Sequence, residues 1–240
     1  MKRRRPGPNA TYAIVPVNVL RVSKTRLAKN LNASGRSGLS AAMLVDVLQT
    51  LRKVRQIRRI VVVSADYEVR RIARVMRVYF LYEGKRRGLN KAVRLAIRDA
   101  KRRKFSTALV LPSDIPLITP REINRLLRLS EGFAVAITPS KDEGGTNALL
   151  LRPPEAISPA FGKNSFQRHL SIAHRKGFPA RVVKLRGIAS DVDEPADVAS
   201  LRRLSLRNQT GRFLRTMNGT MMSRTRSNQS LIGRSQRKRT

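Results

Sequence analysis

The stretch "RIVVVSAD" at residues 59–66 decides the fold, because it places isoleucine and three valines in one unbroken run. A strand that is apolar on both faces is buried on both faces, which is typical of a parallel sheet covered by helices. The stretch "YAIVPV" (12–17) has the same character. Three further strand candidates follow along the chain: "VYFLYE" (78–83), "TALVLPSD" (107–114) and "FAVAITPS" (133–140).

Amphipathic segments lie between these strands. Apolar residues recur at helical spacing over residues 39–51, 89–97 and 123–127, and the third segment follows a Thr-Pro pair that is typical of a helix N-terminus. Strands that alternate with helices predict a layered α/β domain with a mostly parallel sheet. In such sheets, ligands bind beyond the carboxyl ends of the strands.

The composition limits the class of protein. A chain of 240 residues can bury one full-sized core. Without cysteine it has neither disulfides nor thiolate metal ligands, which fits a reducing compartment. The basic N-terminus is not followed by an apolar signal core, and no apolar run is long enough to span a membrane. We therefore expect a cytoplasmic protein that does not bind membranes.

The charge is strongly unbalanced, since 51 lysines and arginines face 15 acidic residues, for a formal net charge of +36. Such a chain binds polyanions through counterion release, whatever its fold. Solubility, adhesion or a bias of the lineage is the simpler explanation of the charge. The chain has no tryptophan, and it contains neither an RNA-binding signature nor zinc-finger spacing. We expect nucleic acid to bind only non-specifically, and a basic nucleic-acid-binding protein is the distant alternative.

The chain divides into three parts. Residues 1–10 form a basic arm, residues 11–204 carry the alternating strands and helices, and residues 205–240 are rich in Ser, Thr, Asn and Arg without an apolar period. We expect a disordered arm, one folded domain and a disordered tail, with neither extension needed for chemistry. The oligomeric state stays open, with a homodimer among the alternatives.

Three aspartates in two separate stretches of the chain indicate a cation site. Asp114 ends an apolar strand, where an unpaired carboxylate is costly, so a cation, a helix N-terminus or a metal should compensate it. Asp191 and Asp193 are two residues apart, so on an extended segment their carboxylates face the same side and repel unless a cation lies between them. Hard oxygen ligands of this kind favour magnesium or manganese over zinc.

Two further stretches contain candidates for nucleotide binding. Lys24 and Arg26 lie in a loop before an apolar stretch, where cations bind a polyphosphate, although a solvated surface explains them equally well. Gly88 permits close backbone approach at a helix start. Asn90 nearby offers an amide to a nucleobase or phosphate, and its alternative role is that of a helix cap.

A third stretch, residues 142–170, indicates an anion site. Thr146 follows a Gly-Gly turn at the start of the apolar run "TNALLL", and it places a hydroxyl there. Gly162 and Ser165 stand at the entry of a helix predicted over 166–176, and helix N-termini bind anions. Ser165 as an N-cap without a ligand remains the alternative.

Seven motifs occur here in the order in which they occur in the 2-phospho-L-lactate guanylyltransferases, a family that this sequence resembles from about residue 12 to residue 201. They are "VPVN…SKTRL", "VVVSAD", "GLNKAV", "LPSDIPLIT", "GGTNALLLRPP", "FGKNSFQRHL" and "DVDEPADVASL". The resemblance implies a three-layer Rossmann-like nucleotidyltransferase fold of the superfamily that includes the molybdenum-cofactor guanylyltransferases.

The resemblance also implies the reaction. The family transfers GMP from GTP to 2-phospho-L-lactate, or alternatively to phosphoenolpyruvate, with release of pyrophosphate, in biosynthesis of the 5-deazaflavin redox coenzyme. The position of Asn18, after "VPV", often holds a lysine in the family, so Lys24 and Arg26 are expected to carry more of the triphosphate contact here.

Motif by motif, the resemblance assigns roles to single residues. It makes Thr146, Gly162 and Ser165 the phospho-acid ligands. It makes Asp114, Asp191 and Asp193 the ligands of Mg²⁺, the expected cofactor.

Overall fold

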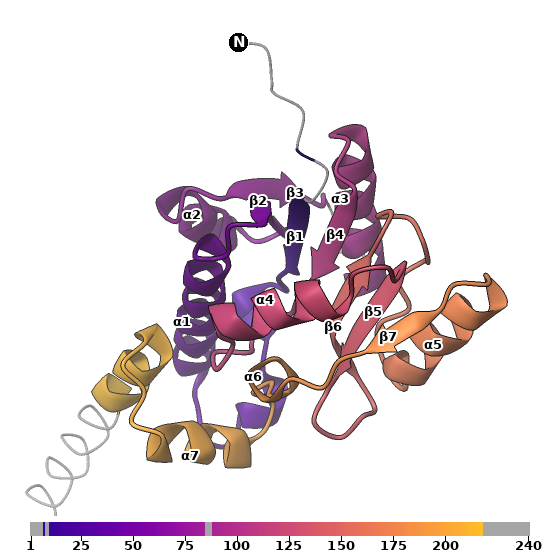
Figure 1. The fold of residues 1–240 in the computed structure, drawn as a ribbon. Helices are drawn as coiled ribbons and strands as arrows, with labels where there is room; N and C mark the ends of the chain where they lie inside the picture. The colour runs from indigo at the N-terminus through magenta and orange to yellow at the C-terminus, as the bar shows by residue number, and fades with distance from the viewer. Residues whose placement is uncertain (1–6, 8–9, 85–87, 218–240) are drawn as a thin grey trace, which may run out of the picture.

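The computed structural model describes residue 7, residues 10–84 and residues 88–217. Its centre is a seven-stranded sheet in the order β3-β2-β1-β4-β6-β5-β7 (Figure 1). The strands are β1 (Thr11–Pro16), β2 (Ile57–Ser64), β3 (Tyr79–Tyr82), β4 (Thr107–Val110), β5 (Val135–Pro139), β6 (Thr146–Leu151) and β7 (Ala180–Val182). The helices are α1 (Ala33–Arg52), α2 (Tyr67–Val75), α3 (Leu89–Arg102), α4 (Pro120–Leu129), α5 (Ser165–Arg175), α6 (Arg186–Ala189) and α7 (Pro195–Arg203).

The sheet is parallel except for β6. Strand β1 pairs in parallel with β2 and β4, and β5 pairs in parallel with β7, whereas β6 runs antiparallel to both β4 and β5. The cause is local, because β5 and β6 are joined by the short turn 140–145, and a short turn can join only antiparallel strands. The start of β6 therefore lies at the edge where the parallel strands end.

Helices cover both faces of the sheet, which gives three layers (Figure 1). On β1, Ala13 and Val15 face a core cluster that includes side chains of α1 and α4, while Tyr12 and Ile14 face a second cluster that includes side chains of α3 and α5. This alternation follows from the twofold period of a strand. The predicted three-layer α/β fold is confirmed.

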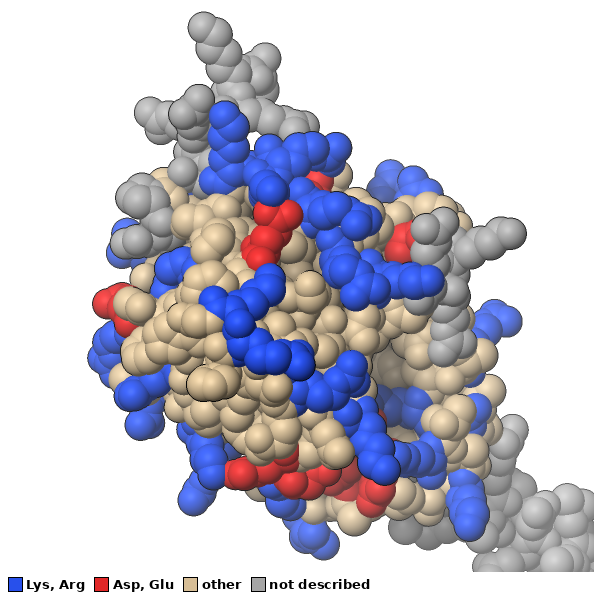
Figure 2. Space-filling view, turned by 90° about the vertical axis from the view of Figure 1, so that its right-hand side faces the viewer, with Lys and Arg blue, Asp and Glu red and all other residues tan. Residues whose placement is uncertain are grey.

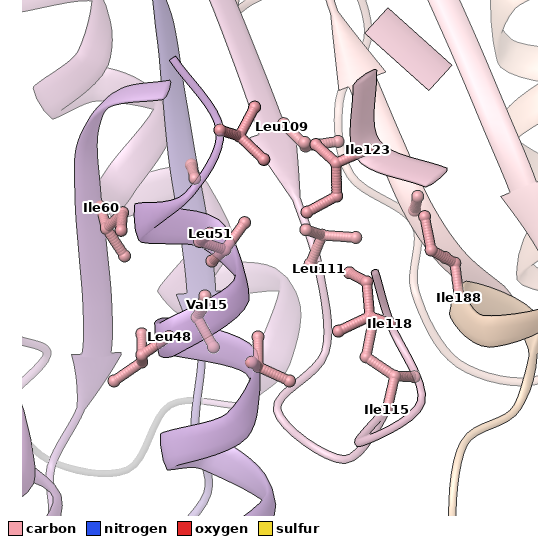
Figure 3. Close-up of a cluster of buried hydrophobic side chains, with 14 of the residues drawn as sticks. Val15, Leu48, Leu51, Ile60, Leu109, Leu111, Ile115, Ile118, Ile123 and Ile188 are labelled. Atoms are coloured by element: carbon pink, nitrogen blue, oxygen red, sulfur yellow. The ribbon is translucent and has the colours of Figure 1, made fainter. Parts of the chain in front are cut away.

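The first of these clusters packs the sheet against helices α1 and α4. Figure 3 shows Val15 and Leu109 of the sheet near Leu48 and Leu51 of α1 and Ile123 of α4. All five side chains are fully buried, and each such burial contributes about 1.5–3 kcal/mol relative to exposure. The loops that leave β1 and β4 therefore start from a rigid base.

The packed part of the chain continues past Leu204, the predicted end of the domain. A helical segment begins at Gln209, and its Leu214 is 2% exposed in a third cluster with Leu39 and Met43 of α1. The prediction of a disordered tail was therefore wrong for residues 205–217. The rest of the predicted tail, residues 218–240, and residues 1–6 and 8–9 of the arm lie outside the described residues.

A buried acid fixes this C-terminal segment to the domain. Asp46 on α1 is 4% exposed and accepts hydrogen bonds from the backbone N–H groups of Gln209 and Thr210, both at 2.8 Å, and from the Thr210 hydroxyl at 2.6 Å. The carboxylate thus satisfies the free N–H groups at the start of the helical segment. In the part of the chain that the structure describes, no helix has the length and apolar character needed to cross a bilayer.

Candidate active site

Three aspartates come together at the carboxyl edge of the sheet. Asp114 follows β4, while Asp191 and Asp193 lie in the loop between α6 and α7. The backbone N–H of Val192 donates to the carbonyl of Asp114 at 3.0 Å, which joins the two loops. The side-chain amide of Asn147, the second residue of β6, donates to the carboxylate of Asp191 at 2.9 Å. The site is therefore built from loops and a strand that are far apart in sequence.

Lys24 occupies the centre of this group. Its ammonium donates to the carboxylate of Asp114 and, at 2.6 Å, to that of Asp193, and the lysine side chain is 7% exposed. Burial alone would lower the pKa of Lys24, but the charges and hydrogen bonds of both aspartates outweigh it and hold that pKa above its ordinary value. The group that compensates the charge of Asp114 in the structure is thus a lysine of the same chain.

The backbone at Lys24 is in the left-handed conformation, with φ of 54°, between two short 3₁₀ turns at Leu20–Val22 and Thr25–Leu27. This conformation costs a side-chain-bearing residue about 1 kcal/mol or more. The two ion pairs offset that cost, and they keep the ammonium directed into the site.

The three carboxylates carry more negative charge than Lys24 neutralises. Burial raises the pKa of Asp191, and the charges of Asp114 and Asp193 raise it further, against the hydrogen bond from Asn147. Within residues 10–84 and 88–217, no three acidic or histidine side chains are arranged so that they could hold a metal ion, and Lys24 lies between two of the predicted ligands. The Mg²⁺ assignment stays a prediction.

Arg26 lies outside this group rather than in it. Its side chain is 70% exposed and reaches Glu194, the neighbour of Asp193, at 3.5 Å. An exposed pair of this kind contributes little to stability. Arg26 is therefore free to turn toward an anionic ligand at the edge of the site.

A pocket of about 290 Å³ adjoins the aspartates, close to the lower limit for small-ligand pockets. Asp114 forms part of its wall, and Asn18, Glu83 and Gly88 line it from the ends of β1 and β3 and the start of α3. Gly88 has a φ of 85°, which favours glycine, and it is also the N-cap of α3. Gly88 thus lines a pocket at the carboxyl edge of the sheet, and its role in nucleotide binding stays a prediction.

Asn90 makes its hydrogen bonds within the chain. Its amide N–H donates to the carbonyl of Phe161 at 3.0 Å, and its amide oxygen accepts from the backbone N–H of Phe161 at 2.7 Å. It does not cap α3, since Gly88 holds that position. The side chain that we expected at a nucleotide thus fixes the loop before α5.

The predicted acceptor residues lie on β6 and around the start of α5. Thr146 begins β6 and is 7% exposed, and Ser165 begins α5 and is 2% exposed. Asn164, in the left-handed conformation, is the N-cap, so Ser165 is not the cap. Gly162 has a φ of 120°, which only glycine adopts readily, and its carbonyl accepts from the backbone N–H of Ser165 at 3.1 Å.

His169 joins these elements and was missed by the sequence analysis. It is fully buried on α5, its Nδ1 lies 3.0 Å from the hydroxyl of Thr146, and its Nε2 accepts from the backbone N–H of Ala160 at 2.9 Å. Burial, with the charge of Arg168 adding, lowers the pKa of His169 to about 4. The sequence did contain a signal, because His169 lies three residues after Phe166 and four before Ala173, a spacing that places it on the buried apolar face of the helix.

Acidification is expected to destabilise the protein through His169. The unfolded chain takes up a proton on this ring below about pH 6.5, whereas the folded chain does so only near pH 4. The free energy of unfolding should therefore fall by about 3 kcal/mol as the pH is lowered through that window. Urea unfolding at pH 7 and pH 4.5 measures this fall, which should be smaller in His169→Gln than in a His174→Gln control. An equal fall between the two pH values in both folded variants would contradict the assignment.

Solved structures of nucleotidyltransferases share this fold. A nucleotidyl transferase from Methanothermobacter thermautotrophicus superposes with a TM-score of 0.61 at 16% identity, over 87% of this chain and 99% of the other. A cytidylyltransferase from Leptospira borgpetersenii gives a TM-score of 0.58 at 10% identity, over 88% of this chain and 95% of the other. At such identities the likeness concerns the fold alone.

Sequence comparison identifies the family. The phosphoenolpyruvate guanylyltransferase of Sphaerobacter thermophilus is 40% identical over 192 residues, which are 80% of this chain and 92% of the relative. The 2-phospho-L-lactate guanylyltransferase of Methanobrevibacter smithii is 33% identical over 206 residues, 86% of this chain and 90% of the relative. A family model described as "Guanylyl transferase CofC like" matches residues 11–234. The chain therefore belongs to this guanylyltransferase family and is a nucleotidyltransferase.

Proposed function

We propose that the protein transfers GMP from GTP to a small phospho-acid and releases pyrophosphate. The observation that carries the proposal is a continuous series of contacts across one edge of the sheet. Asp114 lines the pocket, Lys24 joins it to Asp193, and Asp191 contacts Asn147, the neighbour of Thr146. A nucleotide in the pocket and an acid at Thr146 would meet at this charged group.

The reaction joins two anions, so the protein has to neutralise and align them. An oxygen of the acceptor phosphate attacks the α-phosphorus of GTP and forms a new P–O bond. The bond from the α-phosphorus to the bridging oxygen breaks, and pyrophosphate leaves with the electron pair. A phosphate oxygen is already a nucleophile at neutral pH, so no general base is required. Lys24, together with Arg26 when it turns inward, would stabilise the charge that develops on the pyrophosphate.

We further propose that Asp114, Asp191 and Asp193 hold Mg²⁺ when substrate is bound. Three carboxylates offer the hard oxygen ligands that this ion prefers, and burial, together with the charges of Asp114 and Asp193, raises the pKa of Asp191. The bound ion would supply further neutralisation of the phosphates. Lys24 would then exchange at least one of its aspartate partners for a phosphate oxygen of GTP.

The acceptor is a three-carbon phospho-acid, and two acids are candidates. Phosphoenolpyruvate is favoured by two relatives that are named phosphoenolpyruvate guanylyltransferase, from Sphaerobacter thermophilus at 40% identity and from Rubrobacter xylanophilus at 41%. 2-Phospho-L-lactate is the other candidate, named in the relative from Methanobrevibacter smithii. Either product would enter biosynthesis of the 5-deazaflavin coenzyme, and the use of GTP agrees with a cytoplasmic location.

The purified full-length chain tests the proposal directly. It should release pyrophosphate when it is incubated with GTP, Mg²⁺ and one of the two acids, and the ratio of the two kcat/KM values identifies the natural acceptor. ATP in place of GTP measures the preference for the base. Absence of pyrophosphate with both acids, from protein that is folded by circular dichroism, would overturn the proposed function.

Loss of either acceptor hydroxyl is expected to weaken binding of the acid. In Thr146→Ala and Ser165→Ala, the KM for the acid should rise about tenfold to a hundredfold, because a hydrogen bond to a charged oxygen contributes roughly 1.5–3 kcal/mol. The KM for GTP should change less. Ser171→Ala, which removes an exposed hydroxyl from the same helix, is the matched control. A larger effect on GTP than on the acid would mean that the two sites are exchanged.

The basic surface is a separate property from catalysis. Figure 2 shows lysine and arginine side chains over much of one face, interrupted by a few acidic groups. We propose that this surface binds nucleic acid without sequence preference, since counterion release alone accounts for such binding. A salt titration tests this point, and binding that persisted at high salt with preference for one sequence would favour a nucleic-acid-binding role instead.

A further inference from the structure

His169 has a defined hydrogen-bond partner at each ring nitrogen. Nε2 lies 2.9 Å from the backbone nitrogen of Ala160, and Nδ1 lies 3.0 Å from the hydroxyl oxygen of Thr146. The ring is fully buried, and it packs edge-to-face against Phe161 with the ring centroids 5.0 Å apart. Such a ring has little freedom to rotate.

These contacts determine the tautomer. A backbone N–H can only donate, so Nε2 of His169 must accept from Ala160 and cannot carry a proton. In the neutral ring the proton then lies on Nδ1, which donates to the oxygen of the Thr146 hydroxyl. The proton of that hydroxyl is not used in this contact. In the described part of the chain, His169 is the one hydrogen-bond partner of the Thr146 side chain.

The segment between these two residues is fixed from a second side. Asn90 of α3 exchanges two hydrogen bonds with the backbone of Phe161, at 3.0 and 2.7 Å, directly before Gly162. Since Asn90 already restrains this loop, His169 is not needed to hold it alone. The Thr146 hydroxyl, by contrast, forms a hydrogen bond with His169 and with no other side chain of the described residues.

We propose that His169 is a positioning residue that fixes the rotation of the Thr146 hydroxyl, so that this hydroxyl donates its proton to an oxygen of the phospho-acid. The inference rests on the proposed function, in which Thr146 binds the acceptor. A free hydroxyl populates several rotations, whereas one that accepts from Nδ1 has its lone pair engaged and its proton directed elsewhere. His169 therefore contributes to affinity for the acid without touching it.

Two substitutions of His169 separate the contributions of its two ring nitrogens. In His169→Gln, the amide oxygen can replace Nε2 as acceptor for Ala160, but no donor remains near Thr146. In His169→Asn, the amide N–H can replace Nδ1 as donor to Thr146, while the contact with Ala160 is lost. We expect His169→Gln to raise the KM for the acid about tenfold, and the KM for GTP to stay within about twofold. His169→Asn should keep a KM for the acid closer to that of the wild type.

A double-mutant cycle with Thr146→Val tests whether His169 acts through the threonine. Valine keeps the shape of threonine without the hydroxyl, so His169→Gln should add no further increase in the KM for the acid in this background. Independent, multiplicative effects on KM, or equal changes for the acid and for GTP, would overturn the proposal. If the wild type used no phospho-acid at all, the proposed function would fail instead, which is a distinct result.

The tautomer can be measured without activity and without a variant of His169. Long-range ¹H–¹⁵N correlation spectra of the wild-type protein distinguish Nδ1–H from Nε2–H imidazoles, and the chain has only 2 histidines. His174→Asn assigns the two rings. We expect a neutral Nδ1–H ring for His169 at pH 7, and an Nε2–H ring would overturn the inference even if the His169 variants failed to fold.

Discussion

Asparagine at Asp114 or at Asp193 is expected to lower kcat by about a hundredfold to a thousandfold or more, while the fold is retained. Each substitution keeps the shape of the side chain and removes one of the two charges that surround the ammonium of Lys24. In our proposal the same charges hold Mg²⁺ against the phosphates. Initial rates of pyrophosphate release over a range of Mg²⁺ concentrations measure the effect.

Two controls assign the cause of this loss. Glu155→Gln removes an exposed acid that pairs with Lys101 and should leave turnover unchanged. Lys24→Met keeps all three carboxylates and should lower kcat without raising the Mg²⁺ concentration needed for half-maximal rate, whereas the aspartate variants should raise it. Turnover near that of the wild type in both aspartate variants, with Mg²⁺ still required, would contradict the assignment of these residues.

Truncation after Leu204 is expected to destabilise the domain by roughly 3–6 kcal/mol relative to truncation after Met217. Without residues 205–217, the buried carboxylate of Asp46 loses three hydrogen bonds, and the apolar cluster around Met43 loses Leu214. A loss of this size is a large part of the 5–15 kcal/mol that is typical of a domain. Urea unfolding of the two truncated proteins measures the difference directly.

A point substitution checks the origin of that difference. Asp46→Ala in the full-length chain removes the same three hydrogen bonds and should account for a substantial part of the lost stability. Asp142→Ala, on an exposed turn, is the matched control. Equal urea midpoints for the chains that end at 204 and 217 would show that the C-terminal segment contributes nothing to the fold.

The strands were predictable because they are buried on both faces. Runs such as Ile60–Val63 are apolar without interruption, and a helix of comparable burial would need a longer segment. The short edge strand β7 carried no such run and was not predicted. The C-terminal segment was missed because its packing depends on Asp46, which lies more than 160 residues away in sequence.

The contacts within the candidate site could not be predicted from the sequence. The aspartates stood out in an acid-poor chain, but the sequence did not show that Lys24 pairs with Asp114 and Asp193 across 90 and 169 residues. The contacts of Asn90 with Phe161 and of His169 with Ala160 escaped prediction for the same reason, because these partners belong to a loop of irregular backbone. Residue type indicated the chemistry of the site, and only the tertiary fold determined which polar groups meet.

The single antiparallel strand has a consequence for how the acceptor could change during evolution. Because β6 starts at the carboxyl edge of the sheet, Thr146 and the loop before α5 lie close together in one continuous stretch that ends at His169. The groups around the pocket come instead from three separate connections, after β1, after β3 and after β4, and from strand β2. If this stretch binds the acid as proposed, exchange of one short gene segment could alter the acid that is used while the half around the pocket is inherited unchanged, which fits the two acids named among relatives of one family.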